Sequence, residues 1–386
     1  MRNFFSMIPK TNGKDVTHVK RIFALFCAIL MLFAAGCTGP TEPEPIDTTA
    51  WVTFRTVSGT VVSDDNAVLF EYAYSHPILS TGSTAKVINT KLDNATTAYV
   101  YGSGGVEELT KRAKLDSKNS WFTTYSLQRN VSVARADSRV IAFRYSDYFY
   151  TGGLVGTTTE TVTNYDAVTG QPLSFANLSD DPQGLRAYCR ACLLETLSSD
   201  AYADAGLRPN YAAQLDTVLD FWALTATGLE FIANPYVLTS TDSAVMRFTI
   251  PYEDLDGMLA DKWMPEPHSG NGGLSLGLTG SDRDFQLTEE GDRLVIRVSG
   301  TVYDFSVEQV TTVTIGERTV RRMGQQYLYA PELTDRSIGI TIPAVGSTPD
   351  TLIRCRSANG TEHQFYIAKT DKGFELVSPN EPLIRS

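Results

Sequence analysis

The chain has 386 residues and a formal net charge of −11, with 42% hydrophobic and 20% charged side chains. This composition excludes a disordered acidic tail, because enough apolar surface is present to form a core. Five cysteines are too few for a small disulfide-stabilised fold. A prior of about 150 residues per domain predicts two or three domains.

The first 36 residues have the pattern of a lipoprotein export signal. Residues 1–21 contain five basic residues and one acidic residue, and an unbroken apolar run fills residues 22–35. As a helix, this run rises only about 21 Å, short of a bilayer core of about 30 Å. Ala-Ala-Gly directly before Cys37 resembles a bacterial lipobox. The resemblance implies cleavage before Cys37 and its modification with palmitate-type lipid chains; in an ordinary secretory signal, Cys37 would be incidental.

The segment after the signal indicates an anchored, exported protein. Residues 37–50 are rich in proline, threonine and acid, and we expect a stiff solvated stalk there. Thr38 follows the expected anchor, where an aspartate retains Gram-negative lipoproteins in the inner membrane. By that analogy, we expect a lipid-anchored protein of the cell envelope, with the outer membrane favoured over the cell membrane.

Removal of the signal makes the chain more acidic. Residues 1–37 hold five of the 33 basic side chains and one of the 44 acidic ones, so the remainder has a net charge of −15. Nucleic acid and anionic lipid are poor partners for such a surface. A basic protein or a cation fits it better, and solubility alone also explains the charge.

Three cysteines remain beyond Cys37: Cys189, Cys192 and Cys355. The first two lie in a segment whose apolar spacing predicts a helix over 182–200, with Asp181 as its N-cap. Redox C-x-x-C pairs usually lie at a helix start, whereas this pair lies about two turns inside. We expect small buried residues, or alternatively a structural disulfide that involves Cys355. A zinc site would need a second pair of ligands.

No local pattern predicts catalysis. His76, His268 and His363 are far apart, and no nucleophile elbow or phosphate loop is present. Asp254 and Asp256 form only a fragment of a calcium loop. The sequence thus predicts no catalytic residue, cofactor or metal. A hydrolase whose site forms only in space is the third hypothesis.

The pattern along the chain predicts an α+β fold, with antiparallel sheets, a few packed helices and a smaller all-β C-terminal domain. Beyond the helix over 182–200, helices are expected over about 83–94 and 106–115, and alternating strands elsewhere. The expected parts are a signal over 1–36, a stalk over 37–50, a small α+β module over 51–135, an α+β domain over 136–264 and a β-rich domain over 265–386. Prolines and glycines after residue 264 indicate a linker.

Several short motifs occur in a fixed order between residues 60 and 260. They are a Y-x-G-G-x-x-G loop (Tyr150, Gly152, Gly153, Gly156), an N-[FY]-D-x-x-T-G turn (Asn164, Tyr165, Asp166, Gly170), a hairpin (Phe221, Gly228), Asn234-Pro235-Tyr236 and Ile250-Pro251-Tyr252. In order and spacing they resemble the extracytoplasmic domain of RsiV-type anti-sigma factors. The segment before them is similar to the small module that precedes it there and in PdaC-type peptidoglycan deacetylases.

The sequence departs from that family in three ways. Val155 stands where the family loop has histidine, no deacetylase domain with its metal motifs follows, and the first 21 residues are too few for an anti-sigma segment. The resemblance therefore implies the extracytoplasmic binding or sensing role without either output. In the anti-sigma factors this domain binds lysozyme, whose basic charge suits an acidic partner.

The sequence thus favours a non-enzymatic envelope lipoprotein with a ligand-binding or sensor module. A lysozyme-like protein or a peptidoglycan fragment is the expected ligand. The alternative is a structural or assembly lipoprotein that docks to another envelope component. Structural roles in turns and strands are the other interpretation of the candidate ligand-binding residues, because glycine suits backbone turns and aromatic residues suit β cores. These candidates are Tyr148, Tyr150, Gly152, Gly153, Tyr165 and Tyr236.

Overall fold

The computed structural model describes ten stretches of the chain: 52–80, 82–240, 244–265, 285–290, 293–315, 318–341, 350–357, 361–370, 373–377 and 383–384. All described residues belong to one compact unit, Glu44–Ser386. The signal, Cys37, the stalk and His268 lie outside the described residues. Within the described stretches, no helix is long and apolar enough to cross a membrane.

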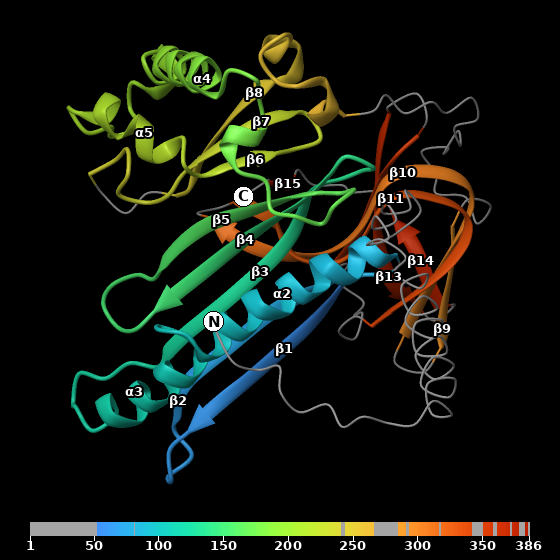
Figure 1. Ribbon diagram of the computed structural model, residues 1–386. Helices are drawn as coiled ribbons and strands as arrows, with labels where there is room; N and C mark the ends of the chain where they lie inside the picture. The colour runs from blue at the N-terminus through green and yellow to red at the C-terminus, as the bar shows by residue number, and fades with distance from the viewer. Residues whose placement is uncertain are drawn as a thin grey trace, which may run out of the picture. The chain divides into compact units, whose positions relative to one another are not determined.

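The fold is α+β, as predicted, and most described strands join one sheet (Figure 1). The helices are α2 (Ser83–Tyr101), α3 (Val106–Asp116), α4 (Pro182–Leu197) and α5 (Leu215–Val218). The N-terminal strands are β1 (Val52–Val62), β2 (Val68–Leu79), β3 (Tyr125–Ala136), β4 (Val140–Tyr150) and β5 (Thr157–Asp166). The middle strands are β6 (Trp222–Leu224), β7 (Gly228–Ala233) and β8 (Met246–Pro251). The C-terminal strands are β9 (Phe285–Glu290), β10 (Arg293–Ile315), β11 (Arg318–Thr341), β12 (Thr351–Arg356), β13 (Glu362–Thr370), β14 (Gly373–Val377) and β15 (Leu383–Ile384).

The large sheet has the order β14-β13-β12-β10-β11-β1-β2-β3-β4-β5, with β9 beside β10 and β15 beside β11. Strand β1 meets β11 at Val52↔Tyr329 and Thr53↔Leu328, so the C-terminal strands continue the N-terminal sheet. The predicted β character after residue 265 is confirmed by β9–β15. The predicted domain boundaries stay predictions.

The segment between β2 and β3 explains the one parallel pair among β1–β5. A parallel neighbour requires a crossover connection, and α2 and α3 supply it. The predicted helix over 83–94 is confirmed but continues to Tyr101. The residues after Asn94 lack an apolar period, and the helix extends because Tyr99 packs edge-on against Tyr74 of β2, with ring centroids 5.8 Å apart. It ends where the Gly102 N–H donates to Ala98 O at 2.7 Å.

A second layer is formed by α4, α5 and the three-stranded sheet β6-β7-β8, which share one apolar core. Helix α4 begins as predicted, since Asp181 accepts a hydrogen bond from the Gly184 N–H at 2.9 Å and Pro182 stands at the first turn. Cys189 is buried and Cys192 partly buried, and both are free, as is Cys355. Burial raises the pKa of Cys189 to about 12, so its thiol stays protonated and apolar in character.

A buried charge cluster joins this second layer to the large sheet. Arg247 of β8 donates from Nε to Glu160 of β5 at 2.9 Å, and Arg144 of β4 pairs with Glu160 and with Glu230 of β7. Glu160 is only 3% exposed, so removal of one partner would leave a buried charge uncompensated. The cluster therefore fixes the position of the second layer against the large sheet.

Candidate ligand-binding groove

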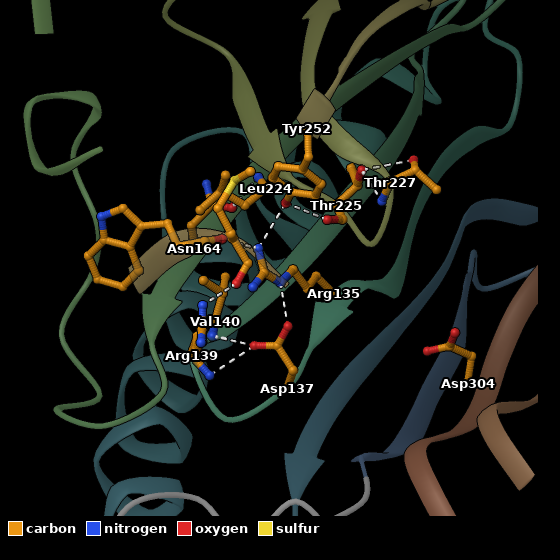
Figure 2. Close-up of polar contacts among 12 residues, drawn as sticks. Arg135, Asp137, Arg139, Val140, Asn164, Leu224, Thr225, Thr227, Tyr252 and Asp304 are labelled. Carbon is orange, nitrogen blue, oxygen red and sulfur yellow. Dashed lines mark hydrogen bonds and ion pairs between the residues drawn. The ribbon is translucent and has the colours of Figure 1, made fainter. Parts of the chain in front are cut away.

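The family-like motifs hold the two layers together through asparagine side chains. Asn164 donates to Trp222 O at 3.1 Å and accepts from the Leu224 N–H at 2.9 Å (Figure 2). Asn234 makes the same pair of contacts with the backbone of Glu160, at 2.9 and 2.6 Å. Each amide thereby makes the two backbone hydrogen bonds that a residue of a paired strand would make. On β5, Asn234 also occupies part of a sheet edge that would otherwise be open to pairing.

The I-P-Y motif belongs to a buried arginine network (Figure 2). Arg135 of β3 is 2% exposed and donates to Asp137 at 2.6 Å, to the Tyr252 hydroxyl at 2.8 Å and to Trp263 O at 2.6 Å. The Tyr252 hydroxyl in turn donates to Thr225 O at 2.7 Å. The network ties β3 to segments more than one hundred residues away, which is a structural role.

The six ligand-binding candidates do not come together in one site. The ring of Tyr148 lies against Gly156, where an added Cβ would be 2.4 Å from its hydroxyl oxygen. Tyr150 donates to Gly153 O at 3.0 Å and so closes the glycine-rich loop on itself. Gly152 and Gly153 have φ of 101° and 109°, which explains the two glycines.

The remaining two candidates lie elsewhere. Tyr165 is 3% exposed and packs edge-on against Phe143 in the core, with centroids 6.4 Å apart, so it belongs to the core and not to a surface site. Tyr236 is 47% exposed beyond β7, with φ of 67°. It lies in the connection between β7 and β8, whereas the glycine-rich loop connects β4 and β5.

The structure instead presents an open groove of about 530 Å³ between α2 and the strands β3, β4 and β5. Its lining comprises Ala95, Ala98 and Tyr99 of α2, Ser103, Gly104 and Gly105 of the next loop, Leu127 and Arg129 of β3, Tyr145, Asp147 and Phe149 of β4, and Thr161 and Thr163 of β5. Two alanines one turn apart on α2 leave the space that larger side chains would fill. The volume lies within the range of small-molecule sites, about 300–1,000 Å³.

An ion pair without net charge lies in the groove. Arg129 contacts both carboxylate oxygens of Asp147, at 2.7 and 2.6 Å, across the β3–β4 register. Its guanidinium lies 3.8 Å from the centroid of the Tyr99 ring. The arrangement is a bidentate pair stacked on an aromatic face, which holds all three side chains in place.

Two residues that line the groove, Tyr99 and Tyr145, have buried phenol hydroxyls with no hydrogen-bond partner among the described residues. The Tyr145 side chain is only 7% exposed. Burial is the main cause that raises the pKa of both phenols, so both stay protonated and can donate as well as accept. A buried hydroxyl without a partner is unfavourable by about 1–3 kcal/mol. These two groups therefore mark the groove as a place for a polar ligand.

Part of the groove lining follows from the sequence of β4. The period-two alternation of a strand puts Tyr145 and Phe149 of β4 on one face and Arg144 on the other, as the structure has them. Tyr99 and Arg129 were missed, because they come from α2 and β3 and meet β4 only in space. The signal that could have found them is the pair of small residues Ala95 and Ala98, which lie one turn apart directly before Tyr99.

His76 contacts a carboxylate but not in a pocket. Its Nδ1 lies 2.8 Å from Thr96 Oγ1 and its Nε2 lies 3.1 Å from Asp93 Oδ1, both on α2, and the ring is 5% exposed. His363 Nε2 lies 3.3 Å from Ser357 Oγ, and His268 is outside the described residues. Within the described stretches, no group of three metal-ligating side chains converges.

The His76 environment predicts an acid-dependent loss of stability. Burial lowers the pKa of His76 below its ordinary value of 6.5, against the opposing effect of Asp93. As pH falls through about 6.5, the unfolded chain takes up this proton before the folded chain does, so folding stability decreases. We expect His76→Gln to lose less unfolding free energy between neutral pH and pH 5 than the parent. Urea denaturation at the two pH values measures these losses. If the parent and His76→Gln lose the same unfolding free energy, the prediction is wrong.

Neither the family models nor the curated proteins contain a match to this chain. Two solved structures of the DUF3298 family, a domain family of unknown function, are similar to it. One, from Bacteroides fragilis NCTC 9343, is 15% identical, covers 56% of this chain and 96% of its own, and has a TM-score of 0.41. The other, from Pseudomonas aeruginosa PAO1, is 16% identical, covers 56% of this chain and 97% of its own, and has a TM-score of 0.40.

Proposed function

We propose that this chain is a non-enzymatic binding module of the bacterial cell envelope, and that the groove between α2 and β3–β5 binds an uncharged stretch of peptidoglycan glycan. The observation that carries the proposal is that two residues lining an open groove, Tyr99 and Tyr145, have buried phenol hydroxyls without a partner among the described residues. An exported, lipid-anchored protein with Cys37 as its first mature residue is part of the same proposal, supported by the lipobox-like sequence.

The chemistry of the groove favours a sugar over a charged ligand. Arg129 and Asp147 neutralise each other, so neither offers a free charge to an ion. Tyr99, Tyr145 and Phe149 supply aromatic surface, and the threonines of β5 supply hydroxyl groups. A sugar ring has an apolar face and a rim of hydroxyls, which matches this mixture of apolar lining and a few polar groups. The RsiV- and PdaC-like sequence pattern supports peptidoglycan as the source of that sugar.

A basic, lysozyme-like protein is the second candidate ligand, and the net charge of −15 beyond residue 37 favours it. Such a partner would contact a broad surface rather than enter a groove. An assembly role, in which the C-terminal strands dock to another envelope component, is the structural alternative.

The test is a calorimetric titration of the full chain with a β-1,4-linked hexamer of N-acetylglucosamine. Ala98→Trp fills the groove, and we expect it to weaken binding more than about tenfold, since the ligand loses most of its contact area. Thr97→Trp is the matched control, because Thr97 is exposed on the same helix and does not line the groove.

Equal affinities of the two tryptophan variants would refute the groove as the binding site. Titration with hen lysozyme in parallel separates the two candidate ligands. Lysozyme binding that Ala98→Trp leaves unchanged, together with no oligosaccharide binding by the parent, would replace the glycan proposal with the protein partner.

A further inference from the structure

A second surface of the chain combines exposed apolar side chains with basic ones. It is made of the end of α3, the α3–β3 connection and the β4–β5 loop, and we call it the tip. Its apolar members are Leu115, Trp121, Leu154 and Val155, with exposed fractions of 67%, 68%, 101% and 68%. Exposed side chains of this size that gather in one place usually mark an interaction site.

Hydrogen bonds place the two loops of the tip side by side. Thr123, two residues after Trp121, lies with its Oγ1 3.3 Å from the Tyr150 hydroxyl. That hydroxyl donates to Gly153 O, directly before Leu154. The end of α3 is fixed to the same region, since the Tyr125 hydroxyl donates to Asp116 at 2.5 Å. The tip is thus held by hydrogen bonds from three elements.

The charge of the tip is opposite to that of the chain. Between residues 109 and 121 there are four basic side chains and one acidic side chain. Lys111 pairs with Glu107 and Arg112 with Asp116, whereas Lys114 and Lys118 are exposed beside the apolar residues. A local basic patch on an acidic protein selects a nearby anionic partner, because screening limits the repulsion from distant charges to about 10 Å.

We infer that the tip inserts its apolar side chains into the interface of an anionic lipid bilayer. Tryptophan and leucine suit the boundary between headgroups and acyl chains, and lysines near an anionic surface are attracted to it. A folded protein partner would instead present a concave apolar surface, and nothing in the loop geometry requires one. The tip and the groove are separate surfaces, and the test of the tip follows Trp121, which does not line the groove.

The experiment uses the protein bound to vesicles through the proposed lipid on Cys37, an anchor that neutral and anionic bilayers hold alike. Contact of the tip is then read as quenching of Trp121 fluorescence by lipids with brominated acyl chains. The reference is Trp121→Phe, which leaves the other three tryptophans. We compare phosphatidylcholine vesicles with vesicles that also contain phosphatidylglycerol.

We expect more quenching of the parent than of Trp121→Phe on the anionic vesicles, and loss of that difference on the neutral ones. Lys114→Glu should abolish the difference, as should Leu154→Ser, whereas Lys86→Glu on α2 is the charge-matched control and should keep it. Quenching that is the same in the parent and Trp121→Phe on both vesicles would overturn the inference. So would quenching that Lys114→Glu leaves intact, since this would remove the role of charge.

Discussion

Replacement of Arg135 by methionine is expected to lower the free energy of unfolding by about 3 kcal/mol, at the low end of values for a broken buried ion pair. The change removes donors to Asp137, Tyr252 and Trp263 O at once. The Asp137 side chain is 24% exposed, so water compensates it in part, which places the expected loss at that end of the range. Urea denaturation of the full chain measures the difference.

Arg112→Met is the matched control. Arg112 also pairs with an aspartate, Asp116, but its side chain is 58% exposed on α3. Surface pairs of this kind contribute between about 0 and 1 kcal/mol. Comparable losses for the two arginines would show that burial of Arg135 does not hold the layers together.

Replacement of Tyr145 by phenylalanine is expected to stabilise the free protein and weaken ligand binding. The hydroxyl has no partner among the described residues, so its removal relieves a desolvation penalty of about 1 kcal/mol or more. With glycan bound, the same hydroxyl gains a hydrogen bond, and its loss should weaken the affinity about three- to tenfold. Opposite signs of the two effects are typical of a group retained for function.

Tyr252→Phe provides the comparison, because the two tyrosines are 7% and 8% exposed. The Tyr252 hydroxyl accepts from Arg135 and donates to Thr225 O, so its removal should destabilise the chain by about 1–3 kcal/mol. Thermal unfolding and oligosaccharide titration of both variants check the contrast. If Tyr145→Phe destabilises the protein as much as Tyr252→Phe does, the hydroxyl has a structural partner and the groove loses its main support.

Features set by neighbouring residues could be predicted from the sequence. Asp181 and Pro182 begin a helix because one caps the free N–H groups and the other has a suitable φ. The faces of β4 follow from alternation, and the two cysteines of α4 follow from helical spacing. Each of these needs only a few residues of context.

Features that join distant segments could not be predicted. Arg135 meets Tyr252 and Trp263 across 117 and 128 residues, and a lone arginine in a strand gives no sign of such partners. The groove requires the parallel β2–β3 pair, which places α2 against β3 and β4. The family-like motifs also gave no sign of such partners: Asn164 and Asn234 hold the two layers together by hydrogen bonds to distant backbone groups.

Binding of a glycan at Tyr99 and Tyr145 is tested most directly by nuclear magnetic resonance of the full chain with ¹³C-labelled tyrosine rings. The N-acetylglucosamine hexamer is added stepwise, with Tyr99→Phe and Tyr145→Phe used to assign the two signals. We expect both signals to shift and saturate together, while the signal of buried Tyr165 stays in place. Saturating oligosaccharide that leaves Tyr99 and Tyr145 unshifted would contradict the proposed function.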